Sequence, residues 1–162
     1  TRGSNTYGPF QFPEKLIPLF TSNALDGRPL PLYGDGRQVR EMLWVGDHAS
    51  AIELVLRAGA AGEAYNVGAE REVANIDTAR RIVELTGADP GLITHVADRP
   101  GHDRRYALDC TKLRALGWRR EVEFDDGLAR TVAWFREHRA WWEAIRAGEA
   151  FADYEAKNYG NR

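Results

Sequence analysis

The sequence predicts a helix-rich α/β fold with short strands and no complete dinucleotide-binding sheet. Apolar residues recur at helical spacing in several stretches, most of which end near a glycine. Between these stretches lie short apolar runs bounded by turn-forming residues, a pattern typical of strands. No run opens with the glycine-rich motif that joins a strand to a helix around a dinucleotide. The 162 residues favour one domain or a large part of one.

Five helices are expected from the spacing of the apolar residues. We place them at residues 16–26, 46–58, 75–86, 111–116 and 125–145. Pro18 fits the first helix only in its first turn, where the missing N–H costs little. Asn75 is expected to cap the third helix, and Gly87 to stop it. Asp125 and Asp126 suit the start of the longest helix, because acidic side chains are favoured at a helix N-terminus.

The strands are expected to be few and short. Two apolar runs, at residues 29–33 and 41–45, flank the turn signal Asp35-Gly36, so a hairpin is predicted there. Further strands are expected at residues 64–67 and 93–96. Loops are predicted at residues 1–13 and 98–105, because glycine, proline, asparagine and charged residues gather in them.

The composition argues against several classes of function. Hydrophobic residues make up 43% of the chain, charged residues 28%, and the net charge is −2. This balance does not favour nucleic-acid binding, and no apolar run approaches the ~20 residues of a membrane span. The one cysteine, Cys110, allows no internal disulfide and fits a reducing cytoplasm. Because the chain begins at Thr1 without a methionine or a signal peptide, we expect it to be part of a longer protein.

Motifs of common catalytic and cofactor sites are missing from the sequence. The nearest approach to a dinucleotide motif, Gly34-Asp-Gly36, falls in the expected turn, and there is no phosphate loop. The four histidines share no zinc-ligand spacing with Cys110, so no metal site is expected. Asp47-His48 could be combined with Ser4 into a hydrolytic triad, but a capping aspartate beside a structural histidine is the preferred interpretation.

Three clusters of polar and aromatic residues are candidate binding elements. The first pairs Asn5 with Lys15, an amide in a loop and a lysine at a helix start, where anions are favoured. The second joins Tyr33 to Arg40, a flat ring and a guanidinium that suit a nucleobase and a phosphate. The third, whose guanidinium forks match phosphate oxygens, comprises Arg99, His102, Arg104 and Arg105. On residue chemistry alone, ordinary turns and solvated charges remain the favoured explanation of each cluster.

Longer strings of residues connect these clusters. They run in order towards Asn158-Tyr159 and cover residues 5–19, 31–36, 39–40, 44–45, 47–48, 65–68 and 98–106. In these strings the chain resembles the dTDP-glucose 4,6-dehydratases, and Asp98-Arg-Pro-Gly-His-Asp-Arg-Arg-Tyr106 separates this family from most other extended short-chain dehydrogenases. The resemblance implies the helix-rich carboxyl-terminal substrate domain of an extended Rossmann-type dehydratase. Residues 1–162 would form the nucleotide-sugar-binding portion, with the amino-terminal Rossmann domain absent.

The resemblance implies a substrate site and no catalytic residue. Thr6 stands where the family usually has a second asparagine near the nicotinamide, and threonine is shorter than that asparagine. The Tyr-x-x-x-Lys pair that serves the family's proton chemistry is missing from this chain. The residues that match substrate-contacting positions are Asn5, Lys15, Leu16, Pro31, Tyr33, Arg40, Asn75, Arg99, His102 and Tyr159.

The resemblance also implies the activity. Enzymes of this family are lyases of deoxysugar biosynthesis, such as rhamnose formation, and convert dTDP-glucose to dTDP-4-keto-6-deoxyglucose and water with NAD. The full-length enzyme would be cytoplasmic and homodimeric. The chain alone is expected to be inactive, to hold no NAD, and to bind dTDP-glucose or dTDP. Neither nucleic acid nor a membrane is an expected partner.

Two alternatives stay open. The chain could be a non-catalytic nucleotide-sugar-binding module, or part of a related UDP-sugar epimerase or decarboxylase, although residues 98–106 argue against the latter. Without a Rossmann sheet, the strand at residues 64–67 would lack partners, and Leu54, Val55 and Tyr65 would be exposed. We therefore expect the isolated chain to be marginally stable or oligomeric.

Overall fold

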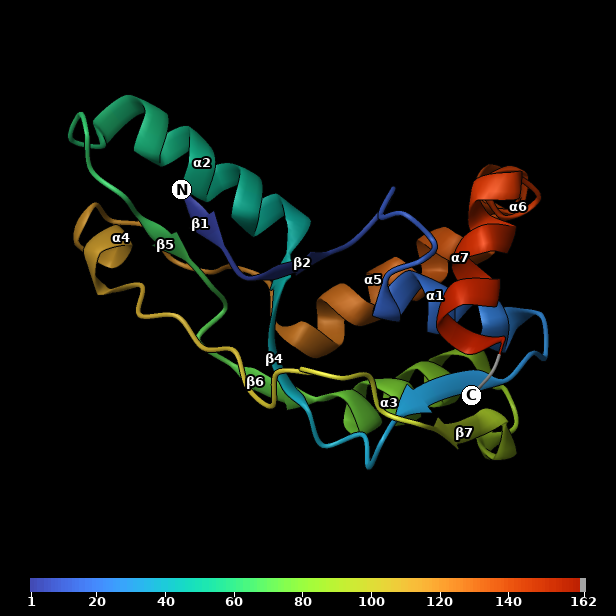
Figure 1. The fold of residues 1–162 in the computed structure, drawn as a ribbon. Helices are drawn as coiled ribbons and strands as arrows, with labels where there is room; N and C mark the ends of the chain where they lie inside the picture. Colours follow the sequence, from blue (N-terminus) through green and yellow to red (C-terminus); the bar gives the residue numbers. More distant parts are fainter. Residues whose placement is uncertain (161–162) are drawn as a thin grey trace.

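The computed structural model describes residues 1–160 and shows an α/β protein in which helices surround three small sheets (Figure 1). Seven α-helices, one 3-10 helix and seven short strands are found in these residues, which confirms the predicted helix-rich fold class. In chain order the elements are β1 (Arg2–Gly3), β2 (Asn5–Tyr7), α1 (Leu16–Leu25), β3 (Leu30–Tyr33), β4 (Val39–Trp44), α2 (Val45–Ala58), β5 (Asn66–Val67), β6 (Glu72–Ala74), α3 (Asn75–Thr86), the 3-10 helix η1 (Pro90–Leu92), β7 (Ile93–Val96), α4 (Thr111–Ala115), α5 (Phe124–Glu137), α6 (Arg139–Arg146) and α7 (Glu149–Tyr159).

The sheets pair strands that are distant in sequence. β1 pairs with β5, β2 with β4, and β3 with β7, all in parallel, while β6 pairs with β4 in antiparallel fashion. Asn5 on β2 therefore lies opposite Met42 on β4, and Tyr33 on β3 lies opposite Val96 on β7. The residues that follow β7 form the third predicted cluster, so this register brings that cluster beside β3. The loop predicted at residues 1–13 contains β1 and β2.

The hairpin predicted between residues 29 and 45 is wrong. A turn does form there, with Gly34 and Gly36 at φ of 56° and 71°, values that favour glycine. β3 nevertheless pairs with β7, and β4 leaves the turn towards β2 and β6 (Figure 1). Leu30 and Leu32 bury one face of β3 in the main core, which fixes the strand where β7 covers its edge. The turn signal thus marks a change of direction and says nothing about the partner strand.

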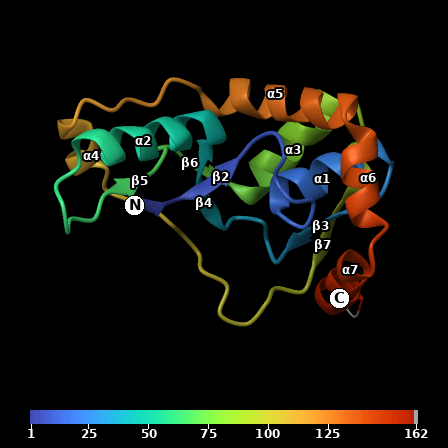
Figure 2. The ribbon, with the colours of Figure 1, turned by 90° about the horizontal axis from the view of Figure 1, so that it is seen from above.

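Helix α1 is buried along most of its length. Every residue from 17 to 24 is buried, and the helix packs on α3, α5 and β3 (Figure 2). Pro18 lies in the first turn, as predicted from its missing N–H. Two buried polar side chains find partners, because the Ser22 hydroxyl donates to Leu19 O at 3.1 Å and Asn23 Nδ2 donates to Pro29 O at 2.7 Å.

Two apolar clusters form the core. The main cluster lies between α1, α3, α5 and β3, and includes Phe20, Leu30, Ile82 and Leu128. Tyr7 joins it, and its hydroxyl donates to Phe124 O at 3.1 Å. The second cluster packs beneath α2 and is made of Leu43, Ala51, Val67, Ala69, Leu113 and Trp118, with Leu54 and Val55 against it.

Two helix predictions need correction. The single helix expected at residues 125–145 is divided at His138 into α5 and α6, and the break lets Trp142 turn into the core and donate from Nε1 to Phe135 O at 2.8 Å. Asn75 does not cap α3. It is the first residue inside the helix, Ala74 holds the cap position, and no side-chain capping bond forms. Gly87 ends α3 at φ 74°, as expected.

The apolar residues exposed on and near α2 are also not the three that were expected, Leu54, Val55 and Tyr65. Tyr65 is buried, with its hydroxyl accepting a bond from Ala60 N at 3.0 Å, and Lys112 Nζ lies 4.4 Å from its ring centre. The large apolar residues exposed on α2 are instead Val45, Ile52 and Leu56. Within residues 1–160, no helix is both long and apolar enough to cross a membrane.

Replacing Leu128 with alanine is expected to destabilise the protein by about 2–5 kcal/mol, because the side chain is fully buried on α5 and its loss leaves a cavity. Urea unfolding followed by circular dichroism gives the change in free energy. Leu56→Ala is the matched control: Leu56 is 85% exposed on α2, so the change should stay within about 0.5 kcal/mol. Equal losses for the two variants would contradict this description of the core.

Candidate functional site

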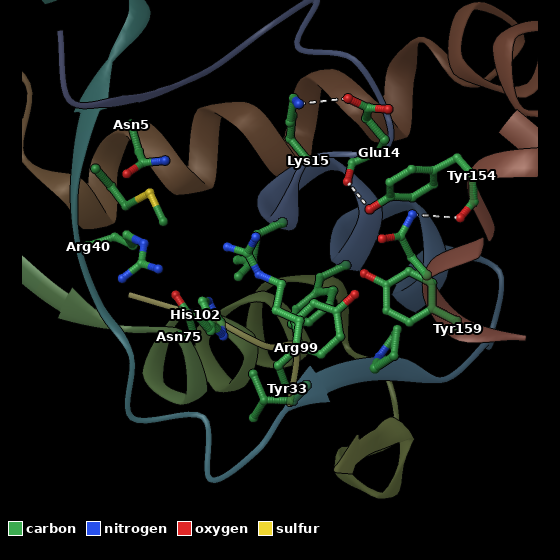
Figure 3. A pocket seen from close by; sticks show the side chains of 16 residues that line it. Asn5, Glu14, Lys15, Tyr33, Arg40, Asn75, Arg99, His102, Tyr154 and Tyr159 are labelled. Atoms are coloured by element: carbon green, nitrogen blue, oxygen red, sulfur yellow. Dashed lines mark hydrogen bonds and ion pairs between the residues drawn. The ribbon is translucent and has the colours of Figure 1, made fainter. Parts of the chain in front are cut away.

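One pocket of about 320 Å³ gathers residues from seven parts of the chain (Figure 3). Its wall is built from β2, the start of α1, β3, β4, the start of α3, the loop after β7, and α7. The lining residues are Asn5, Glu14, Lys15, Leu16, Phe20, Pro31, Leu32, Tyr33, Arg40, Met42, Asn75, Arg99, His102, Tyr154, Asn158 and Tyr159. All ten residues predicted to contact substrate are among them. The structure thus brings together members of all three clusters, from Asn5 to His102, and adds Tyr159 from α7.

Six lining residues were not singled out from the sequence. Glu14 and Leu32 lie inside the quoted strings, while Phe20 and Met42 are apolar residues that also belong to the main core. Tyr154, Asn158 and Tyr159 share one face of α7, where Asn158 Nδ2 donates to Tyr154 O at 2.9 Å. Their i, i+4, i+5 spacing is the signal that could have revealed this wall, but the tail had not been assigned as a helix.

Arg40 places a buried cation in the wall. Only 6% of the residue is exposed, and its guanidinium donates to two carbonyl oxygens, Val39 O at 2.7 Å and Asp103 O at 2.9 Å. The guanidinium carbon lies 4.3 Å from the centre of the Tyr106 ring. Burial lowers the pKa of Arg40 from its usual value, yet an arginine keeps its proton. Since no carboxylate of residues 1–160 forms an ion pair with it, this charge is available to an anion in the pocket.

The third predicted cluster is divided by the fold. Arg99 and His102 line the pocket, whereas Arg104 and Arg105 are paired with acids outside it. Arg104 Nη1 lies 2.8 Å from Asp35 Oδ1, and Arg105 forms an ion pair with Glu72. Among the described residues of the wall, the cations are Lys15, Arg40 and Arg99, and Glu14 is the one acid.

Stacked aromatic rings form the opposite part of the wall. Tyr33 and Tyr159 stack with ring centres 5.6 Å apart and planes at 19°, and His102 meets Tyr33 edge-on at 5.8 Å. Tyr154 packs edge-on against Tyr159, and its hydroxyl donates to Glu14 O at 2.8 Å. Burial, followed by the bond with Tyr154, raises the pKa of Tyr159, so this phenol stays neutral. A flat, neutral wall of this kind suits a planar ring of a ligand.

The start of α1 supplies an exposed charge. Lys15 holds the position just before the helix, in extended conformation, and its side chain is 59% exposed. Its ammonium lies 2.6 Å from Glu14 Oε1, an exposed ion pair that contributes little to stability. Lys15 can therefore exchange this partner for a bound anion at small cost.

Asn75 carries an acceptor with no partner. The residue is 5% exposed at the start of α3, and its Oδ1 is buried without a hydrogen bond. Its own N–H donates to Gln38 O at 3.0 Å, which ties the helix start to the β3–β4 connection. Because an unpaired buried acceptor costs free energy, Asn75 Oδ1 is poised for a donor that a ligand would bring.

Thr6 does not line the pocket. Its hydroxyl lies 2.6 Å from His48 Nδ1, so this side chain has a hydrogen-bond partner within the protein. Asp47 accepts from the N–H groups of Glu121 and Val122, at 3.2 and 3.1 Å, which makes it a structural anchor rather than a triad member. Burial lowers the pKa of His48, which favours its neutral form.

The glycines nearest to a dinucleotide motif lie in a turn between two strands. Gly34 and Gly36 close the turn between β3 and β4 and do not open a helix, so the phosphate-binding geometry of a dinucleotide fold is not built here. Within residues 1–160, no three histidine, cysteine or acidic side chains gather as metal ligands.

The comparison with protein families agrees with this geometry. Residues 1–131 match the family model described as GDP-mannose 4,6 dehydratase. The chain belongs to this dehydratase family. A dTDP-glucose 4,6-dehydratase of Streptomyces niveus is 51% identical over 148 residues, which cover 91% of this chain and 44% of that protein. Another, dTDP-glucose 4,6-dehydratase 1 of Escherichia coli K12, is 45% identical, and the match covers 100% of this chain and 47% of the relative.

Solved structures of a dehydratase and of an epimerase share the fold. A dTDP-glucose 4,6-dehydratase from Streptomyces venezuelae with NAD bound has a TM-score of 0.86 and 53% identity, covering 89% of this chain and 45% of that one. The UDP-glucose 4-epimerase of Thermotoga maritima with UDP-glucose has a TM-score of 0.80 and 33% identity, covering 84% and 45%. The chain thus spans less than half the length of these relatives.

Replacing Asn75 with leucine is expected to leave the free energy of unfolding unchanged or to raise it by about 1 kcal/mol, because it removes a buried acceptor that has no partner. Asn23→Leu is the control: that buried amide donates to Pro29 O and accepts from Arg146 Nη2, so its loss should cost about 1–3 kcal/mol. Urea unfolding compares the two. If Asn75→Leu destabilised the protein as much as Asn23→Leu, a structural role for Asn75 would be indicated.

Proposed function

We propose that the pocket binds a dTDP-sugar and that the chain supplies the substrate-binding part of an NAD-dependent dTDP-glucose 4,6-dehydratase. The observation that carries the proposal is the joint placement of a buried, unneutralised Arg40 and a stacked aromatic pair in one pocket. A nucleoside diphosphate sugar combines a planar base with a dianionic linker and several hydroxyls. The pocket offers a complement to each of these parts.

The lining residues divide naturally among the parts of such a ligand. Tyr33, with Pro31 beside it, suits the thymine base, while Arg40, Arg99 and Lys15 suit the diphosphate. Residues whose amides can donate and accept, Asn5 and Asn75, suit hydroxyl groups. Leu16 closes the pocket at the start of α1, and His102 and Tyr159 border the aromatic wall.

The role of this chain in the reaction is to bind and orient the substrate. The NAD-dependent conversion of dTDP-glucose to dTDP-4-keto-6-deoxyglucose and water would need proton-transfer and cofactor groups that these residues do not provide. We therefore assign residues 1–162 to nucleotide-sugar binding and expect the chain alone to be inactive. In this proposal the complete enzyme is a cytoplasmic homodimer, and the single buried thiol of Cys110 is in keeping with a reducing compartment.

A UDP-sugar enzyme is the second candidate. The similarity to the Thermotoga maritima epimerase, at a TM-score of 0.80, is the observation that favours it. The identity is 33% there against 53% for the Streptomyces venezuelae dehydratase, which supports the dTDP-sugar assignment. A non-catalytic sugar-nucleotide module would use the same pocket and would differ by lacking a catalytic portion in the intact protein.

Isothermal titration calorimetry of the chain is expected to show binding of dTDP with weaker binding of UDP. Arg40→Ala should weaken dTDP binding by about 10- to 100-fold, because a charge-assisted bond to phosphate is worth about 1.5–3 kcal/mol. Arg57→Ala, which removes an exposed cation on α2, is the matched control and should bind as the unchanged chain does. A folded chain that binds no dTDP at millimolar concentration would refute binding by the isolated chain. A preference for UDP would refute the dTDP assignment.

A further inference from the structure

A carboxylate outside the pocket wall holds the loop that supplies two of its residues. Asp98 follows β7 and does not itself line the pocket. Its Oδ1 accepts bonds from Arg99 N at 2.8 Å and from His102 Nδ1 at 2.6 Å. Its Oδ2 accepts from Gln38 Nε2 at 2.8 Å. One side chain is thus bonded to both pocket residues of the loop and to the β3–β4 connection.

Gln38, which holds Asp98 at the β3–β4 connection, is buried and hydrogen-bonded. Gln38 is 2% exposed, and its main-chain carbonyl accepts from Asn75 N, so it also touches the start of α3. Next to it, Val39 N donates to Arg104 O at 2.8 Å and fixes the far end of the loop. A Cβ at Gly34 would lie 3.0 Å from Asp98 Oδ2, so glycine at this turn permits the close approach of the carboxylate. The loop is thereby held at both ends against the strands that carry Tyr33 and Arg40.

The bond to Nδ1 decides which edge of the His102 ring is available. An imidazole that donates from Nδ1 keeps only Nε2 for another partner. The His102 side chain is 6% exposed and meets Tyr33 edge-on, so the ring has little freedom to turn. The carboxylate suits this task because it accepts several bonds at once, and the His102 bond holds the pKa of Asp98 below its usual range.

We propose that Asp98 is a positioning residue, which fixes the Nδ1-protonated form of His102 and the backbone at Arg99 so that both side chains meet the ligand in a set orientation. This inference rests on the proposed function of the pocket for the nature of the ligand. The bonds by which Asp98 orients the loop do not depend on which ligand the pocket binds. Removing Asp98 is therefore expected to weaken ligand binding without removing any group that touches the ligand.

Three substitutions test the role. Asp98→Ala removes all three acceptor bonds and is expected to weaken dTDP binding about tenfold or more, since bonds to charged acceptors are among the stronger ones. Asp98→Asn keeps an oxygen for Arg99 N and His102 Nδ1, and Gln38 can turn its unpaired Oε1 towards the new amide, so affinity should largely return. Asp109→Ala, an exposed aspartate that accepts from Thr111 N, is the matched control and should stay within about twofold of the unchanged chain.

A second measurement asks which ring nitrogen of His102 carries the proton. A merely structural role of Asp98 would not change this. Nitrogen-15 NMR of the imidazoles, at about pH 8 where an ordinary histidine is neutral, should show His102 carrying its proton on Nδ1. Assignment follows from the signal lost in His102→Gln. The Nδ1 proton should persist in Asp98→Asn and lose its dominance in Asp98→Ala.

The outcomes separate the two proposals. A chain that binds no dTDP but shows the Nδ1 proton and its loss in Asp98→Ala would refute dTDP binding by the isolated chain and support the positioning of His102 by Asp98. An unchanged chain with the proton on Nε2 of His102 would overturn the positioning role even if Asp98→Ala failed to fold. Asp98→Ala that binds dTDP as the unchanged chain does would also overturn it.

Discussion

The burial of α1 is the constraint on which the rest of the molecule depends. A helix with eight consecutive buried residues needs partners on every side, and α3, α5 and β3 supply most of them. α6 and α7 complete the enclosure, through the bond from Arg146 to Asn23 and that from Tyr154 to the main chain before α1. Since Lys15 and Leu16 mark the open end of this helix, the elements that bury α1 also surround the pocket at its start.

The pocket is built at a cost that the core offsets. Arg40 is desolvated without an acidic partner, and Asn75 keeps an unpaired acceptor. Neither feature stabilises the isolated chain, whereas both become favourable when an anion and a hydrogen-bond donor arrive. Stacked Tyr33 and Tyr159 join β3 to α7 across the same space, so the aromatic wall exists only when α7 is docked. The main core therefore stabilises the protein, while the pocket at the start of α1 serves binding.

The ends of α1 and α3 and the spacing of their apolar residues could be predicted, because these depend on neighbours in the sequence. The break at His138 could not be predicted, since it depends on the burial of Trp142 and on the bond from Trp142 to Phe135 in the preceding helix. The hairpin failed for a similar reason: Asp35-Gly36 is a genuine turn, but the burial of Leu30 and Leu32 gave β3 a partner about sixty residues away. Asn75 was expected to cap α3 and instead lies inside it beside the pocket.

By itself, the sequence determined the fold class, the family resemblance and ten residues that meet in one pocket. It could do so because motif strings and helical periodicity are local properties. Only the tertiary structure decided which members of the basic cluster face inward. Arg99 and His102 line the pocket while Arg104 and Arg105 pair with Asp35 and Glu72, acids that lie far away in the chain. The role of Asp98 likewise emerges only in three dimensions, because its partner Gln38 lies sixty residues earlier and meets it where the loop after β7 crosses the β3–β4 turn.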